Sequence, residues 1–208
     1  MPTLNRVLIA GYYGFGNTGD EAILAVMLDG LRRQAPGHRA IIISGDPAGT
    51  QALHGVESVL WSDLPAVVEA VRQCDLLILG GGGLFHDYYG CDPSRAFTRR
   101  NSDLPLVASY PLLAAALNKP AMLYAVGVGP IFTDCGQQYT HAAADVCTAI
   151  TVRDSASAEL LAGTGIDPAR ITVTADPAWL MDGPSPDSAD DWLRAEGIPL
   201  DRPRLGLS

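Results

Sequence analysis

The sequence predicts an α/β fold with a Rossmann-like, doubly wound parallel sheet. Short apolar runs alternate along the chain with longer segments whose apolar residues recur at helical spacing. Glycine-rich loops follow several of the apolar runs, notably at residues 11–19 and 80–83. Alternating strands and helices joined by short loops favour a parallel sheet covered on both faces, and right-handed crossovers then give the doubly wound topology.

The first expected strand, residues 7–10, is a continuous apolar run, which is typical of a strand buried on both faces. The helix expected over residues 20–34 carries one apolar stripe from Ile23 to Leu31. Similar runs predict further strands at residues 40–43, 56–61, 75–79, 121–126, 149–152 and 171–174. Further helices are expected at residues 64–74, 103–118, 137–147 and 154–161.

The composition changes towards the end of the chain. Residues 182–187 are rich in turn formers and predict a linker, followed by a short helix at 190–196. Residues 203–208 resemble the opening of a new strand. We therefore expect a Rossmann-like domain over residues 1–182, and a linker with the start of a truncated second domain over residues 183–208.

Charge and composition narrow the class of protein. The chain has 208 residues, of which 48% are hydrophobic, and a formal net charge of −9. Such acidity argues against a nucleic-acid partner, because binding nucleic acid requires clustered cations. The sequence also contains no basic amphipathic helix of the kind that docks on a membrane. The first residues lack the apolar stretch of a signal peptide, and no run is long enough to span a bilayer. A cytoplasmic location is expected.

The cysteines show no metal-binding pattern. The chain has four of them, at positions 74, 91, 135 and 147, with no CxxC pair and no spacing typical of zinc ligands. We expect reduced structural thiols, no metal site and no cofactor.

The first glycine loop lies between a strand and a helix, where open α/β sheets bind their ligands. Residues Gly14 to Gly19 formally match GxGxxG, but Asp20 and Glu21 place two carboxylates at the helix N-terminus. These carboxylates would repel a pyrophosphate, which disfavours dinucleotide binding. Asp20 instead becomes a candidate for proton transfer or substrate positioning.

The same loop supplies candidate substrate contacts. Gly14 and Gly16 allow the backbone to approach a ligand closely. Asn17 and Thr18 could cap the following helix or form hydrogen bonds with sugar hydroxyls.

The second glycine loop follows the strand expected at residues 75–79. Gly81 and Gly82 lie within it, and they allow close approach either to a ligand or to another chain segment. His86 and Asp87 are the best acid–base pair from a single loop, although Asp87 could equally cap a turn.

Two later strand ends carry further polar residues. Arg153 could clamp a carboxylate or phosphate, or it could pair with Asp154. Asp176 is a candidate substrate contact or a turn residue.

Six motifs, in order, resemble those of the CsaB-type polysaccharide pyruvyl transferases. They are Gly11-Tyr-Tyr-Gly-Phe-Gly-Asn-Thr-Gly-Asp-Glu-Ala-Ile-Leu24, Ser44-Gly-Asp-Pro47, Gly80-Gly-Gly-Gly-Leu-Phe-His-Asp87, Gly127-Val-Gly-Pro130, Val152-Arg-Asp-Ser155 and Thr174-Ala-Asp-Pro177. Six motifs in the family's order are far more specific than any one of them.

The resemblance implies a two-domain fold similar to the GT-B glycosyltransferases, with the active site between the halves. It implies phosphoenolpyruvate as donor and, as acceptor, a glycan or lipid-linked sugar, with at most peripheral membrane association through that acceptor. The product would be a pyruvate ketal on a cell-surface or secreted glycan. Arg153 matches a donor-site residue of the family, whereas the carboxyl-terminal half, with further donor-site residues, is not present. The isolated chain is therefore expected to be inactive.

The sequence also departs from the family pattern. Relatives more often carry Ser and Gln near positions 83–87, and the segment 88–101, with Arg95, Arg99 and Arg100, is longer and more charged than expected. Two other functions stay open: a GT-B-like glycosyltransferase with a nucleotide-sugar donor, or a non-catalytic glycan-binding module.

Overall fold

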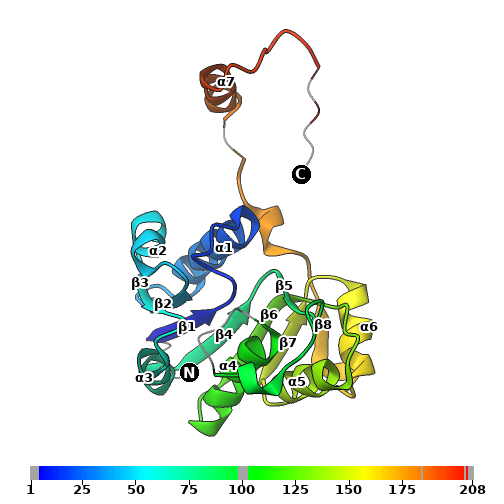
Figure 1. The fold of residues 1–208 in the computed structure, drawn as a ribbon. Coiled ribbons are helices and arrows are strands. Elements are labelled where there is room, and N and C mark those ends of the chain that lie inside the picture. The colour runs from blue at the N-terminus through cyan, green and yellow to red at the C-terminus, as the bar shows by residue number, and fades with distance from the viewer. Residues whose placement is uncertain (1–4, 98–102, 184, 204, 206–208) are drawn as a thin grey trace.

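The computed structural model describes residues 5–97, 103–183, 185–203 and 205, and it confirms the Rossmann-like α/β fold (Figure 1). The strands are β1 Arg6–Ala10, β2 Arg39–Ser44, β3 Glu57–Leu60, β4 Leu76–Gly80, β5 Gly83–Phe85, β6 Ala121–Val128, β7 Ala149–Val152 and β8 Ile171–Val173. The α-helices are α1 Thr18–Gln34, α2 Pro47–His54, α3 Leu64–Gln73, α4 Leu104–Ala116, α5 Asp134–Asp145, α6 Ser155–Gly163 and α7 Pro186–Ala195. Short 3₁₀ turns cover η1 Pro93–Arg95, η2 Pro168–Arg170 and η3 Pro177–Leu180.

The sheet is parallel, and its strand order reverses once. The order is β3-β2-β1-β4-β6-β7-β8, with β5 paired to β6 beside the main path. Strands β2 and β3 are therefore added on one side of β1, and β4, β6, β7 and β8 are added on its other side. The loops after β1 and β4 flank this switch point, where open α/β sheets bind their ligands.

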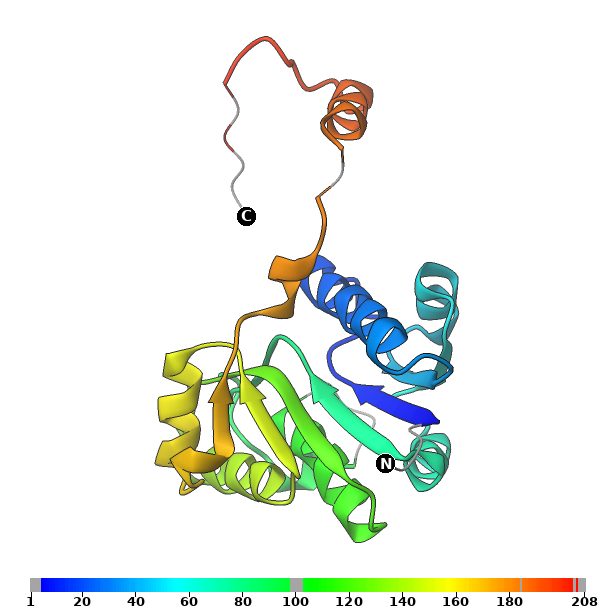
Figure 2. The same cartoon turned by 180° about the vertical axis from the view of Figure 1, so that it is seen from behind.

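Both faces of the sheet are buried, as the continuous apolar strands require. Along β1, Leu8 and Ala10 belong to the larger core cluster, which α3, α4 and α5 cover. Val7 and Ile9 belong to the smaller cluster, which packs under α1. Figure 2 shows α1 crossing this second face, with the other helices of the core behind the sheet.

The structure corrects the expected elements in a few places. Helix α2 and the short strand β5 were not among the predicted elements. Helix α2 nevertheless forms, since Asp46 caps its N-terminus and Gly55, with φ of 67°, ends it. Helix α5 begins earlier than residue 137 because the Thr133 side chain accepts a hydrogen bond from the Gly136 N–H.

The strand β6 contains an irregularity close to its carboxyl end. Its register with β7 shifts between Leu123 and Val126, and Ala125 there has φ of 47°. The Ala125 N–H donates to Oγ1 of Thr151 at 2.7 Å instead of to a backbone carbonyl. A bulge of this kind redirects the end of a strand, and here it sets the course of the loop that follows Val128.

The end of the described chain lies away from the sheet (Figure 1). Helix α7 begins at Pro186 rather than near 190, after Ser185 caps it. The expected strand at 203–208 and the arginines at 99 and 100 fall largely on residues outside the described ones. Within the described ranges, no helix is both long and apolar enough to cross a membrane.

Candidate functional site

The two glycine loops at the switch point contact each other through one buried residue. Tyr13 is fully buried, and its hydroxyl donates to the carbonyl oxygen of Gly80 at 2.5 Å. Burial, together with the neighbouring carboxylates of Asp20 and Glu21, raises the pKa of Tyr13 well above its usual value, so the hydroxyl stays a donor. A Cβ atom on Gly11 would lie 2.5 Å from the Tyr13 ring, so only glycine fits there. The loops are thus held together at one edge of the sheet.

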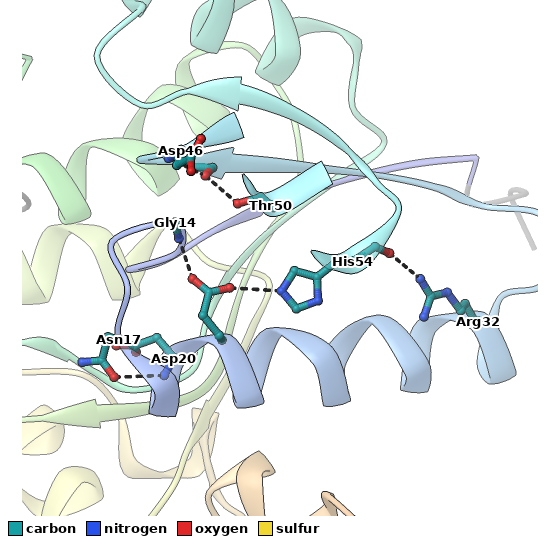
Figure 3. A network of polar contacts seen from close by, with 9 residues as sticks. Gly14, Asn17, Asp20, Arg32, Asp46, Thr50 and His54 are labelled. Carbon is teal, nitrogen blue, oxygen red and sulfur yellow. Dashed lines mark hydrogen bonds and ion pairs between the residues drawn. The ribbon is translucent and has the colours of Figure 1, made fainter. Parts of the chain in front are cut away.

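A polar network, partly buried, ties the first glycine loop to two helices (Figure 3). Glu21 accepts a hydrogen bond from the Gly14 N–H at 2.7 Å and contacts Nε2 of His54 at 3.0 Å. The side chains of His54 and Glu21 are only 7% and 17% exposed. Arg32 in turn donates to the His54 carbonyl oxygen at 3.0 Å. His54 therefore positions the loop by fixing α2 against α1.

A cavity of about 480 Å³ opens beside these loops. Its wall is formed by the loops after β1, β3 and β5 and by the first turns of α1 and α4. The lining residues are Gly11, Tyr12, Phe15, Asn17, Asp20, Trp61, Gly83, Leu84, His86, Tyr89, Gly90, Asp103, Leu104 and Val107. The size and the mixture of apolar walls with a few polar groups are typical of small-molecule sites.

Asp20 brings an unusual carboxyl group into this cavity. Burial first, and then the charges of Glu21 and Asp176, raise its pKa to about 6, against the opposing effect of Arg153. Its side chain lies over Gly82, where a Cβ atom would come 2.5 Å from its Oδ1. A carboxyl group with this pKa can exchange a proton near neutral pH, which ordinary aspartates cannot do.

His86 lines the same cavity. Its Nδ1 is buried and has no hydrogen-bond partner within the described part of the chain, and its ring lies 5.0 Å from that of Tyr88. Burial lowers its pKa, although Asp87 and Asp103 act in the opposite direction. His86 is therefore neutral at neutral pH, and its ring can donate or accept a hydrogen bond from substrate without carrying charge.

Asp87 does not line the cavity and instead organises another loop. It accepts hydrogen bonds from the N–H groups of Phe132 and Thr133, at 2.7 and 2.8 Å, and from the Thr133 hydroxyl at 2.6 Å. Burial pushes its pKa upward, but these hydrogen bonds outweigh burial and hold the pKa below its usual value. Every one of these contacts stabilises the ionised form, and they join Asp87 to a distant loop rather than to a turn of its own.

A disulfide joins the same two segments. Cys91, after the cavity residue Gly90, is bonded to Cys135 at the start of α5. The expectation of four reduced thiols was therefore wrong for this pair, because residues 44 positions apart meet only in the folded chain. Cys74 and Cys147 are free and buried, as expected.

Arg153 lies at the carboxyl end of β7, beside the bulged strand β6. A Cβ atom on Gly127 would lie 2.8 Å from Cζ and Nε of Arg153, and one on Gly83 would lie 3.9 Å from its Nη2. Arg153 also pairs loosely with Asp176 at 3.4 Å and with Asp154 at 3.5 Å. The guanidinium thus rests on glycine backbone next to the cavity, and its side chain remains 36% exposed.

The structure separates the predicted site residues into groups. Asn17, Asp20 and His86 line the cavity, while Arg153 and Asp176 stand beside it and act electrostatically on Asp20. The other predicted residues are not among those that line the cavity: Gly14, Gly16, Thr18, Gly81, Gly82 and Asp87.

Some predicted contacts have clear structural roles. Asn17 caps α1, since its side-chain oxygen accepts from the Gly19 N–H at 2.9 Å. Gly81 has φ of 68°, and a Cβ atom on it would lie 2.1 Å from Ile23. This glycine therefore allows a close approach to another chain segment. Sequence reasoning missed the aromatic residues of the cavity and Asp103; aromatic residues inside the first motif were the one local signal.

Fold and site together define the class of protein: a Rossmann-like domain with a ligand cavity at the topological switch point. Solved structures share this fold. HepE of Anabaena, in complex with UDP, matches with a TM-score of 0.54 and 11% identity over 92% of this chain and 50% of its own. MnaA of S. aureus, also with UDP, matches with a TM-score of 0.54 and 11% identity. The match covers 91% of this chain and 51% of MnaA. UDP-GlcNAc 2-epimerase of Neisseria meningitidis, bound to UDP-GlcNAc, matches with a TM-score of 0.52 and 11% identity. The match covers 93% of this chain and 51% of the epimerase.

The family follows from the sequence model that matches the chain. The polysaccharide pyruvyl transferase model covers residues 17–204, so the chain belongs to that family. No curated protein sequence matches the chain significantly. The chain spans about half the length of the three solved structures named above, each of them 11% identical to it, so these likenesses show the fold alone.

Proposed function

We propose that the chain contributes the amino-terminal half of the active site of a transferase that moves pyruvate from phosphoenolpyruvate onto two hydroxyls of a sugar. The observation that supports this most directly is the juxtaposition of Arg153 and Asp20 at the switch-point cavity. The guanidinium of Arg153 is a cation that can bind an anionic donor, and the carboxyl group of Asp20 can exchange protons near neutral pH.

The chemistry of an enol phosphate assigns a task to each group. Protonation of the methylene carbon of phosphoenolpyruvate leaves an electrophilic C2, which a sugar hydroxyl attacks. A second hydroxyl of the same sugar then displaces inorganic phosphate from C2 and closes the ketal, and each hydroxyl gives up its proton. In this proposal Arg153 binds the donor carboxylate or phosphate, and Asp20 accepts a hydroxyl proton.

The remaining residues orient the acceptor. Neutral His86 and the Asn17 amide offer hydrogen bonds to further hydroxyls of the sugar. The proton donor for the methylene carbon is assigned to the second half of a two-domain enzyme, which faces this cavity. The proposal places the reaction in the cytoplasm, with a glycan precursor as acceptor.

Phosphate release from phosphoenolpyruvate by the complete gene product, with and without a panel of sugar acceptors, tests this function. We expect acceptor-dependent release that Arg153→Ala abolishes while the fold, followed by circular dichroism, is kept. Arg170→Ala is the matched control, because Arg170 is paired with Asp145 far from the cavity. Release unaffected by Arg153→Ala removes that residue from the donor site.

The pH profile tests the second group. We expect kcat/KM to rise as the pH passes through about 6, because Asp20 must lose its proton to act as a base. Asp20→Asn should remove this ionisation and lower kcat at least a hundredfold. No release with any acceptor, but turnover of nucleotide sugars inhibited by UDP, would instead identify a glycosyltransferase.

A further inference from the structure

One wall of the cavity consists of aromatic rings. Tyr12 and Phe15 are stacked, with ring centroids 4.5 Å apart and an interplanar angle of 16°. Phe15 also meets Trp61, at 6.0 Å and 59°. All three residues, which we call the aromatic wall, line the cavity.

The backbone beneath the aromatic wall holds it in place. A Cβ atom on Gly45 would lie 2.6 Å from Cε1 of Phe15, so the ring rests directly on this glycine. The Gly45 N–H donates to the Tyr13 carbonyl at 2.8 Å, and the Trp61 N–H donates to the Ser44 carbonyl at 2.9 Å. The loops after β1, β2 and β3 are therefore joined, and the rings are preorganised.

Core packing does not account for the whole wall. Tyr12 and Trp61 pack with part of their surface against the larger core cluster. Phe15 belongs to neither core cluster, and it is 36% exposed although it lies in a hollow of the surface. A ring that is fixed in position but still open to the cavity is suited to contact with a ligand.

The polar groups of the cavity define what that ligand must offer. Asn17, Asp20 and Asp103 line the same space, and Asp103 is already paired with Arg95 at 2.7 Å. The carboxylate of Asp20 accepts hydrogen bonds from hydroxyls but repels an anion, which is drawn instead towards Arg153. The ligand of this part of the cavity therefore has one apolar face and an edge of neutral hydroxyls, and a pyranose ring has both.

We propose that the aromatic wall is the acceptor-sugar subsite, in which the C–H face of a pyranose ring packs on Phe15 and Trp61 and its hydroxyls point towards Asp20. This assignment rests on the proposed pyruvyl transfer for the identity of the sugar as acceptor, but binding of the sugar itself is independent of any donor.

Kinetics of the complete gene product give the first test. Phe15→Leu and Trp61→Leu keep apolar bulk but remove the ring, and each should raise the acceptor KM about tenfold, the effect of losing roughly 1.4 kcal/mol. The KM for phosphoenolpyruvate should stay within twofold. Trp61→Phe should recover part of the loss, and Trp192→Leu, on α7, is the matched control. An unchanged acceptor KM in both leucine variants overturns the proposal.

Saturation-transfer NMR separates the subsite from the reaction. The probes are the methyl glycosides of glucose, galactose and mannose and of their N-acetylamino forms, with sorbitol as an acyclic control. Irradiation of aromatic protons should reach ring C–H protons of at least one glycoside, and Phe15→Leu, which removes no core residue, should weaken this transfer. Transfer without turnover keeps the subsite and rejects pyruvyl transfer, whereas transfer to no glycoside, or undiminished transfer in Phe15→Leu, rejects the subsite.

Discussion

The guanidinium of Arg153 lies against the backbone of Gly127, so that a Cβ atom there would come within 2.8 Å of Cζ and Nε. Gly127 follows the bulge at Ala125, and its close fit with Arg153 links the irregular end of β6 to the arginine that we propose binds the donor. A side chain at 127 must displace the end of a flexible arginine rather than backbone. The strand geometry therefore sets the position of the cation.

We expect Gly127→Ala to raise the KM for phosphoenolpyruvate about tenfold, because the arginine retains its charge but loses its position. Thermal unfolding should change little, since the arginine can move aside. Gly30→Ala is the matched control, because nothing lies within 4 Å of a Cβ atom there. A donor KM equal to that of the unmodified enzyme would argue that the position of Arg153 is unimportant.

The raised pKa of Asp20 predicts a pH-dependent cost to stability. Below its usual value of 3.8 the carboxyl group is protonated in both the folded and the unfolded chain. As the pH rises through about 6, the unfolded chain is already ionised and the folded chain must ionise against burial, so stability is lost.

Asp20→Asn removes this cost. On going from pH 4 to pH 8, the free energy of unfolding of this variant should rise by on the order of 1 kcal/mol relative to that of the unmodified chain. This is less than the full pKa shift would give, because the side chain is partly solvated. Urea unfolding at both pH values measures the difference. Asp29→Asn, on an exposed part of α1, is the control, and a gain for Asp20→Asn that is the same at both pH values contradicts the assigned pKa shift.

Asp87 predicts the opposite dependence on pH. Its pKa is lowered, so its contribution to stability is present above its usual value of 3.8 and is lost as the pH falls through the folded value. Asp87→Asn should cost about 1–3 kcal/mol at pH 7, because the Phe132 and Thr133 donors lose a charged acceptor. Denaturant unfolding checks this. A large loss of kcat at unchanged stability would instead favour the catalytic role first assigned to Asp87.

The disulfide predicts a response to reductant. Cys91 and Cys135 close a loop of 44 residues, and removing such a link costs on the order of 2–4 kcal/mol. Dithiothreitol should therefore lower the Tm of the unmodified chain, whereas Cys91→Ser should have the lower Tm already and should not respond. Equal responses of the two proteins would show that the bond does not form in solution.

The fold was largely predictable because its signals are local. Short apolar runs marked every strand of the described chain except β5, and the stripe on α1 marked its buried face. Helix α2 escaped prediction because proline and glycine weaken the helical pattern, while the cap that stabilises it, Asp46, also suits a turn. Strand β5 escaped because its pairing with β6 depends on a distant segment.

The sequence by itself determined the order of elements, the two glycine loops at the switch point and the resemblance that the family model confirmed. These depend on residues close together in the chain. Only the tertiary structure decided that Phe15, Trp61 and Asp103 share a cavity with Asp20. It also decided that Asp87 accepts hydrogen bonds from the loop at Thr133, and that Cys91 forms a disulfide with Cys135. The physical reason is that burial, charge coupling and contact across the sheet depend on distances in space between segments far apart in sequence.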